Sequence, residues 1–153
     1  MISKGVQLFV RTSIPTKVGQ FSTGVDKNER VQFSIYLCSW LGFLGVTAEG
    51  FKKLKIRKLI QENRPSKFGE LILLSDGLGK LLKEHDDALR KFRNAVFHLR
   101  DGSEDLQRFL RNQPHRLMWA EELQMAFGQF FSSYRILCQI QYVLENRNNE
   151  IFK

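Results

Sequence analysis

The sequence predicts an all-α fold, an antiparallel bundle of four to five helices that follows an irregular N-terminal arm. Over long segments, apolar residues recur at intervals of three and four, the spacing that gathers side chains on one helix face. Thirteen Phe stand against three Pro, and no low-complexity run interrupts the chain. The 153 residues, 42% of them hydrophobic, are enough to bury one core, so we expect a single helical domain over residues 28–153.

The predicted arm covers residues 1–27, where no helical period is found. Residues 6–10 have the composition of a short strand, and Pro15, Gly19 and Gly24 then mark a loop. The apolar pieces are too short for the hydrophobic core of a signal peptide. We expect the arm to pack either on the domain or on a partner subunit.

The first helix is expected to begin near Asp26, a candidate N-cap with Glu29 three residues later. Residues 31–48 form a run of 18 without a charge, which is long enough for a membrane span. Polar residues are scattered through this run, and they favour a buried core helix instead. Gly42 and Gly45 either permit a close contact with another helix or end this one.

The next helix, expected over residues 48–63 and ended by Pro65, carries the densest charge. Between Phe51 and Lys67 there are seven basic residues and one acidic residue. This run is either a face that follows phosphates or a solvated helix face. The candidate anion-binding residues are Lys52, Lys53, Lys55, Arg57 and Lys58, with Arg90 and Arg100 further along the chain.

A third helix is expected over residues 66–84, where Gly77 and Gly79 are the candidate points of bending. The chain then continues as a helix, either directly or after a break at residues 85–87. We expect Gly102 to stop that segment.

Two further helices complete the predicted bundle. A short one is expected over residues 103–112, because Ser103 and the acidic residues after it suit a helix N-terminus. The last one should run from Pro114 to about Asn146, with a long apolar stripe.

Charge and cysteine content indicate the class of partner and the cellular location. The net charge of +8 favours an anionic partner, nucleic acid before an acidic protein or a membrane surface. Cys38 and Cys138 are too far apart in the sequence for a disulfide framework or a zinc motif, and we expect both to be small buried hydrophobes. A reducing, cytoplasmic location is therefore predicted.

The segment over residues 86–102 carries the candidate chemistry. As a helix, it places its apolar residues on one face, at intervals of three and four. Off that face, Arg93 is followed by four residues and then by His98, with Asn94 directly after the arginine. In its helical setting, this motif resembles the HEPN family of small all-helical proteins. Their pattern is Arg, four to six residues and His, often with a polar residue after the Arg.

The resemblance implies a metal-independent endoribonuclease that uses no cofactor and acts as a homodimer, with the two motifs facing one another across one RNA cleft. Arg93 would stabilise the phosphate in the transition state, as a forked donor. His98 would be the general acid and base at the ribose 2′-hydroxyl or the leaving oxygen, because histidine is the side chain suited to proton transfer at neutral pH. Asn94 would orient the phosphate or the histidine. The family often serves in toxin–antitoxin or defence systems, which implies an antitoxin or effector protein as a further partner, and no membrane.

Helix geometry constrains this motif. At ~100° per residue, Asn94 and His98 lie about 40° apart, whereas Arg93 and His98 lie about 140° apart. Either the helix begins or distorts inside the motif, or a two-fold partner supplies the complementary group. Phe97 lies off the apolar stripe, between the Arg and His directions, and should be exposed in a monomer.

Two alternatives remain beside the ribonuclease. Asn94 and His98 are also what a solvated helix face contains, which would leave a non-catalytic RNA-binding or protein-interaction module. His85 has acidic neighbours, but adjacent residues on a helix point in different directions and do not close on one metal ion. His115, in the first turn of the last helix, is expected at the surface.

Overall fold

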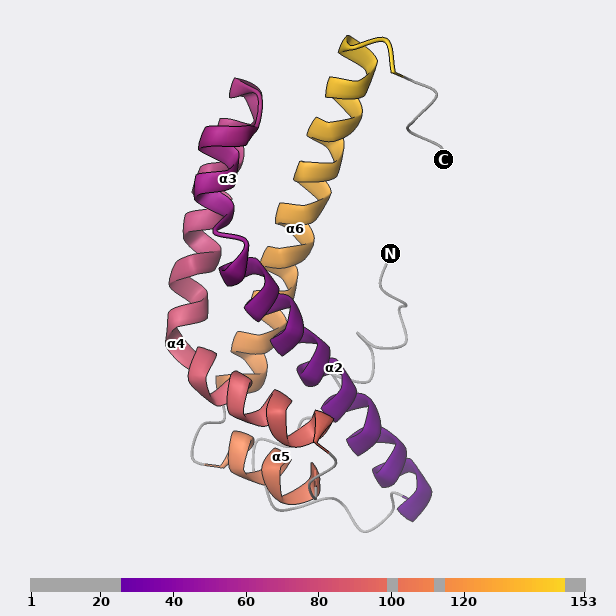
Figure 1. Ribbon diagram of the computed structural model, residues 1–153. Helices are drawn as coiled ribbons and strands as arrows, with labels where there is room; N and C mark the ends of the chain where they lie inside the picture. Colours follow the sequence, from indigo (N-terminus) through magenta and orange to yellow (C-terminus); the bar gives the residue numbers. More distant parts are fainter. Residues whose placement is uncertain (1–25, 99–101, 112–114, 148–153) are drawn as a thin grey trace. The chain divides into compact units, whose positions relative to one another are not determined.

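The computed structural model describes residues 26–98, 102–111 and 115–147, and nearly all of them are helical. The predicted all-α helical bundle is confirmed, and the strand expected at residues 6–10 lies outside the described residues. Figure 1 shows the elements in order: α2 (Lys27–Lys53), α3 (Ile56–Asn63), the 3₁₀ helix η1 (Ser66–Glu70), α4 (Leu71–Phe97), α5 (Gly102–Leu110) and α6 (His115–Leu144).

The chain divides into two compact units, residues 1–35 and 36–153. In the first unit the structure describes residues 26–35, where α2 begins. The backbone N–H of Arg30 donates to the carbonyl of Asp26 at 3.2 Å, so the helix start predicted near Asp26 is confirmed. The core, the kinked helix and the candidate site all belong to the second unit.

The boundary predicted between the first two helices is wrong. Helix α2 continues through Gly42, Gly45 and residue 48 as far as Lys53. The break comes at Lys55, whose φ of 47° is left-handed, and α3 follows from Ile56. This left-handed residue therefore separates the basic end of α2, Lys52 and Lys53, from α3.

Gly45 marks a close approach between α2 and α4. A Cβ built on Gly45 would lie 2.9 Å from the Cβ of Arg93, which is closer than real Cβ atoms come to one another. Only glycine lets the two helices meet at this distance. Of the two alternatives for the glycines of this helix, the close contact is therefore correct for Gly45.

Helix α4 is kinked at His85, where φ is −137° and ψ is 17°. Gly77 and Gly79, the predicted points of bending, lie inside regular helix, and the break predicted at residues 85–87 is the correct alternative. The indole Nε1 of Trp119 donates to the carbonyl of Leu81 at 2.8 Å, and its ring meets the His85 ring edge-on. This hydrogen bond and this ring contact hold Trp119 of α6 beside the kink.

Both ends of α4 differ from the prediction. The helix expected from Ser66 starts as the 3₁₀ helix η1 after Pro65, and α4 itself begins at Leu71. It ends at Phe97, well before Gly102, and Gly102 opens α5 instead of stopping α4. Glycine is most common just after a helix end but is also tolerated at a helix start, which explains the error.

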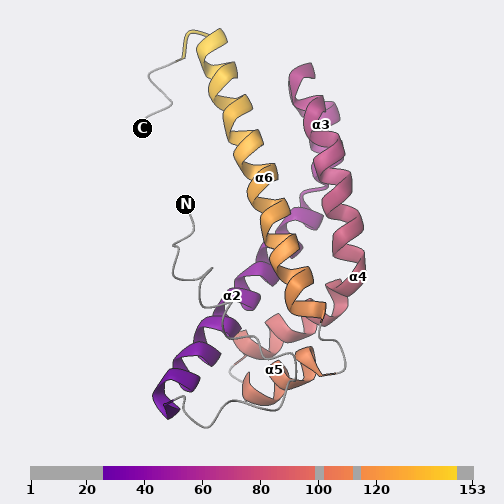
Figure 2. The same cartoon turned by 180° about the vertical axis from the view of Figure 1, so that it is seen from behind.

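The core lies between α2, α4 and α6. Its most completely buried large side chains are Leu41, Leu78, Leu89, Leu123 and Phe130. Phe51 of α2 packs edge-on against Phe127 and Phe130 of α6, with ring centroids 5.4 Å apart in both pairs. Figures 1 and 2 show α3 and α6 beside the N-terminal limb of α4 (71–84), and α5 beside its C-terminal limb (86–97).

The predicted core positions are confirmed in part. Trp119 is buried, and Trp40 is half-buried with its indole nitrogen donating to the side chain of Gln124. Cys38 and Cys138 are free thiols that pack against the core, but both are half-buried and not enclosed as predicted. Each lies where its helix leaves the core, which explains the partial exposure.

Candidate functional site

Arg93 lies in the C-terminal limb of α4, and its guanidinium group is held on two sides. The Oδ1 atom of Asn94 accepts from Nε at 3.1 Å and from Nη2 at 2.6 Å. Nη1 forms an ion pair with Oε2 of Glu49, which comes from α2. The Arg93 side chain is 19% exposed, so the charge faces solvent only along a narrow edge.

His98 is the C-cap residue directly after α4, and its side chain is exposed. Its backbone N–H donates to the carbonyl of Asn94 at 3.1 Å, which closes the last turn. Residues 93–97 keep regular helical backbone angles, so the distortion considered for the motif is absent from this described segment. Within a single chain, Arg93 is hydrogen-bonded to Asn94, and the His98 side chain takes no part in that hydrogen-bond network.

Phe97 lies off the core stripe as predicted, with 49% of its surface exposed. Its ring is not isolated, because it packs edge-on against Phe43 of α2 with the centroids 5.9 Å apart. A Cβ on Gly42 would touch the Phe97 ring at 3.4 Å. The two phenylalanines form an exposed aromatic pair beside the Arg-Asn-His motif.

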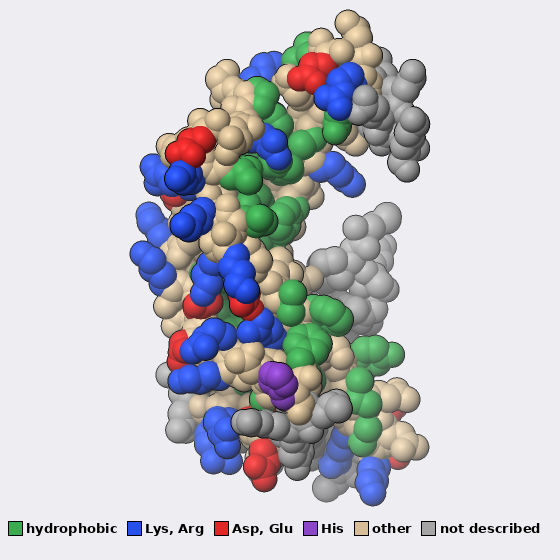
Figure 3. Space-filling model, viewed as in Figure 1, with side chains coloured by type: hydrophobic (Ala, Val, Ile, Leu, Met, Phe, Trp, Pro, Cys, Tyr) green, Lys and Arg blue, Asp and Glu red, His purple; other side chains and the backbone are tan. Residues whose placement is uncertain are grey.

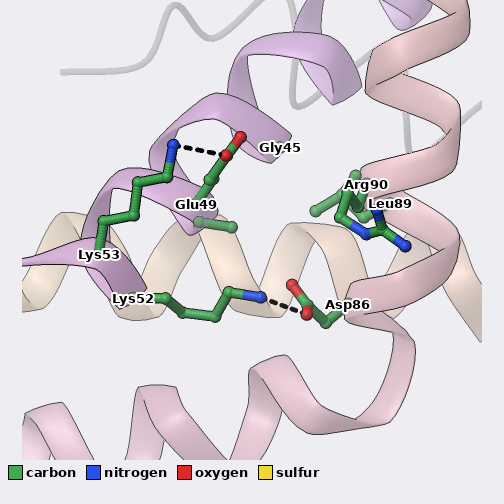
Figure 4. A pocket seen from close by; sticks show the side chains of 8 residues that line it. Gly45, Glu49, Lys52, Lys53, Asp86, Leu89 and Arg90 are labelled. Carbon is green, nitrogen blue, oxygen red and sulfur yellow. Dashed lines mark hydrogen bonds and ion pairs between the residues drawn. The ribbon is translucent and has the colours of Figure 1, made fainter. Parts of the chain in front are cut away.

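A shallow pocket of about 220 Å³ opens between α2 and the C-terminal limb of α4, as Figure 4 shows. Charged side chains of both signs line it: Lys53 pairs with Glu49 at 2.8 Å, and Lys52 pairs with Asp86. The lining residues are Gly45, Ala48, Glu49, Lys52, Lys53, Asp86, Leu89 and Arg90. The pocket is therefore adjacent to Arg93, and its cations already have acidic partners.

The same pattern extends over the predicted basic face. Arg57 of α3 donates through Nη1 to both carboxylate oxygens of Asp76, at 2.8 and 3.1 Å. Lys58 lies 3.8 Å from Glu62, and Lys55 has no ion-pair partner among the described residues. In Figure 3, basic side chains gather along the side formed by α3 and α4, with acidic ones among them. The basic run is thus a mixed-charge surface that braces α2 and α3 against α4.

The two remaining candidate cations are Arg90, which lies in α4, and Arg100. Arg90 pairs with Asp87 at 2.7 Å, and hydrogen bonds from Lys91 and Arg90 lower the pKa of the Asp87 carboxyl to about 2. Arg100 lies outside the described residues. Asp87 therefore stays ionised at neutral pH, and Arg90 remains paired.

His85 and His115 stand apart from this site. Burial at the kink, and after it the charge of Arg116, lowers the pKa of His85, while Glu84 acts in the opposite direction. This histidine packs edge-on against Trp119, and among the described residues no group of three or more potential metal ligands is found. His115 is exposed in the first turn of α6, as expected.

Glu49 is the residue that sequence reasoning missed. Its spacing to Lys53 is that of an ordinary surface pair on one helix, and nothing in the sequence places it against Arg93. The sequence contains only an indirect signal for the contact of Glu49 with Arg93. Gly45 precedes Glu49 by one helical turn, and a small residue that admits a second helix directs the side chain one turn later towards that helix.

Comparison of the chain with protein-family models, curated proteins and solved structures finds no match. By length and composition alone, α2 is apolar enough to cross a membrane, a property shared by core helices and signal sequences. The site is therefore interpreted from its own residues.

Proposed function

We propose that this chain is a HEPN-like helical domain that acts as a metal-independent endoribonuclease. The observation that carries the proposal is the arrangement at the end of α4, where Asn94 orients the guanidinium of Arg93 and His98 stands exposed at the helix end. A base near neutral pKa and an oriented forked cation are the two groups that attack by a 2′-hydroxyl on phosphate requires.

A homodimer is part of the proposal. Because residues 93–97 are regular helix, Arg93 and His98 of one chain point in directions about 140° apart. A two-fold partner would set the Arg93 of one protomer against the His98 of the other, and would produce two equivalent composite sites. The exposed Phe43 and Phe97 lie beside the motif, where such a contact would cover them.

The first test is RNA cleavage by the purified protein in EDTA, with Arg93→Ala and His98→Ala as variants. We expect wild-type cleavage and a loss of about 10²-fold or more in each variant, the usual scale for a missing acid–base or charge-stabilising group. A His98→Ala protein that cleaves as fast as the wild type would remove the basis of the proposal.

Mixing the two inactive variants tests the shared site. A heterodimer of Arg93→Ala and His98→Ala chains contains one intact composite site, so random exchange should restore about a quarter of the wild-type activity. If Arg93 and His98 act within one chain, mixing restores nothing. The two variants are incubated together at low protein concentration, which favours dissociation of the dimers and exchange of subunits without heating.

A specific observation supports a second function, a non-catalytic RNA-binding or protein-interaction module. Glu49 neutralises Arg93, and the cations at positions 52, 53, 57 and 58 lie beside carboxylates. Such pairs, two within one helix and three between helices, are also what a purely structural surface contains. Binding of RNA without cleavage by the wild-type protein would favour this module.

A cytoplasmic location, RNA as the ligand and an antitoxin or effector protein as a further partner belong to the same proposal. The apolar α2 then serves as a core helix, since Leu41, Leu44 and Ala48 are buried in its second half. Purification from the soluble fraction without detergent is the expected behaviour, and a requirement for detergent would favour a membrane role for α2.

A further inference from the structure

Glu49 is the charged group that the proposed mechanism does not use, although it contacts the arginine at its centre. Its Oε2 atom pairs with Nη1 of Arg93, and its Oε1 atom accepts from Nζ of Lys53 at 2.8 Å. The side chains of Arg93 and Lys53 are 19% and 75% exposed. The carboxylate therefore joins one largely buried cation to one that solvent reaches freely.

The hydrogen-bond donors of Arg93 are occupied on two edges. Asn94 takes Nε and Nη2, the fork that would otherwise hold two phosphate oxygens at once. Glu49 takes Nη1 and cancels the positive charge locally. Arg93 has five N–H donors, and one on Nη1 and one on Nη2 have no acceptor in these bonds. A phosphate that binds them lies beside Glu49, whose negative charge repels it.

We propose that Glu49 competes with phosphate for Arg93 and so keeps the site weak for RNA until the carboxylate shifts to Lys53 alone. This inference rests on the proposed function, because it assumes that Arg93 meets an RNA phosphate. Lys53 makes the shift accessible, since Glu49 retains an ion pair with the residue one turn along α2 when it leaves Arg93. Glu49 is thus an autoinhibitory residue at the candidate site.

The size of the effect follows from the charge removed. Glu49→Gln deletes one negative charge near a phosphate bound at Arg93 and keeps an amide oxygen that can still accept a hydrogen bond. For a separation of about 6 Å and an effective dielectric constant between about 40 and about 80, Coulomb's law gives about three- to tenfold tighter binding.

The experiment measures binding of a fluorescent single-stranded 2′-O-methyl oligoribonucleotide, which lacks the 2′-hydroxyl nucleophile and is not cleaved by this chemistry. Glu62→Gln is the matched control, because Glu62 is an exposed acid on α3, 3.8 Å from Lys58, and its loss changes the net charge equally. We expect Glu49→Gln to bind about three- to tenfold more tightly than Glu62→Gln. The gain should vanish in the Arg93→Ala background.

Lys53 provides a second, independent variant. Lys53→Gln leaves Glu49 with Arg93 as its only partner, so it should weaken binding more than Lys58→Gln, which removes an equally exposed cation. Circular dichroism of each variant establishes that it is folded, so that a change in affinity is not a change in folded fraction.

The outcomes separate this inference from the proposed function. If neither the wild type nor Glu49→Gln binds the oligonucleotide, or if Arg93→Ala binds it as tightly as the wild type, both ideas are overturned. If Arg93→Ala weakens binding but Glu49→Gln binds no more tightly than Glu62→Gln, only the role of Glu49 is overturned. A gain that persists without Arg93 also overturns it.

Discussion

Substituting Gly45 by Ala tests the helix crossing on which the candidate site depends. The new methyl group would lie 2.9 Å from the Cβ and 3.3 Å from the Cγ of Arg93. A Cβ is anchored to its backbone, so Arg93 cannot move this atom away by changing rotamer, and α2 and α4 must separate. Overpacking of this kind costs about 1–3 kcal/mol of folding free energy.

Helix propensity acts in the opposite direction, and a second glycine of the same helix isolates it. Gly50 also lies within α2, and no atom stands within 4 Å of a Cβ built on it. Gly50→Ala should therefore stabilise the protein by about 0.5–1 kcal/mol through propensity alone. Since both substitutions gain this term, the difference between the variants should be the packing cost, about 1–3 kcal/mol.

Urea denaturation, monitored by far-UV circular dichroism, measures that difference. The midpoints of wild type, Gly45→Ala and Gly50→Ala are compared with a common m value, the slope of unfolding free energy against urea concentration. We expect Gly45→Ala to unfold at lower urea than Gly50→Ala. If the two variants are stabilised equally, the helices do not approach closely at Gly45, and the placement of Glu49 against Arg93 loses its support.

Three further perturbations have defined outcomes. Trp119→Phe removes the hydrogen bond from the indole to the Leu81 carbonyl and should cost about 0.5–1.5 kcal/mol in the same urea assay, whereas an unchanged midpoint would mean that water replaces the indole. Because the pKa of His85 is lowered on folding, the unfolded chain binds the extra proton, so stability should fall as the pH drops below about 6.5, and His85→Gln should flatten this dependence in denaturation midpoints. Arg57→Gln breaks an exposed ion pair with Asp76 and should cost less than about 1 kcal/mol, so a larger loss would show that α3 depends on this pair for docking.

The periodicity of apolar residues was sufficient to predict the helical class, because burial of one face decides helix formation over long segments. It placed Leu89 and Phe92 in the core and Phe97 outside it, as the structure has them. Helix ends were harder to place. The left-handed residue between α2 and α3 is Lys55, a residue type with no preference for that conformation, so tertiary packing and not local sequence sets the break.

The candidate site was predictable only within one helix. Spacing along α4 gave Arg93, Asn94 and His98, together with the angle between them. The partners that come from other helices were not accessible, since a sequence does not state which faces meet. Glu49 against Arg93 and Asp86 against Lys52 are both contacts across the interface of α2 with α4, and they change a row of apparently available cations into paired ones.

The ion pairs of this surface also bear on how the proposed RNA binding should respond to salt. A polyanion normally gains affinity by releasing condensed counterions, one for each phosphate that a protein cation neutralises. Here Lys52 and Arg57 already carry carboxylate counterions that belong to the chain itself, Asp86 and Asp76. Contacts through these side chains would exchange one fixed anion for another, so the affinity should decline less steeply with added salt than the number of basic residues implies. The protein then carries its own counterions, and these set its sensitivity to ionic strength.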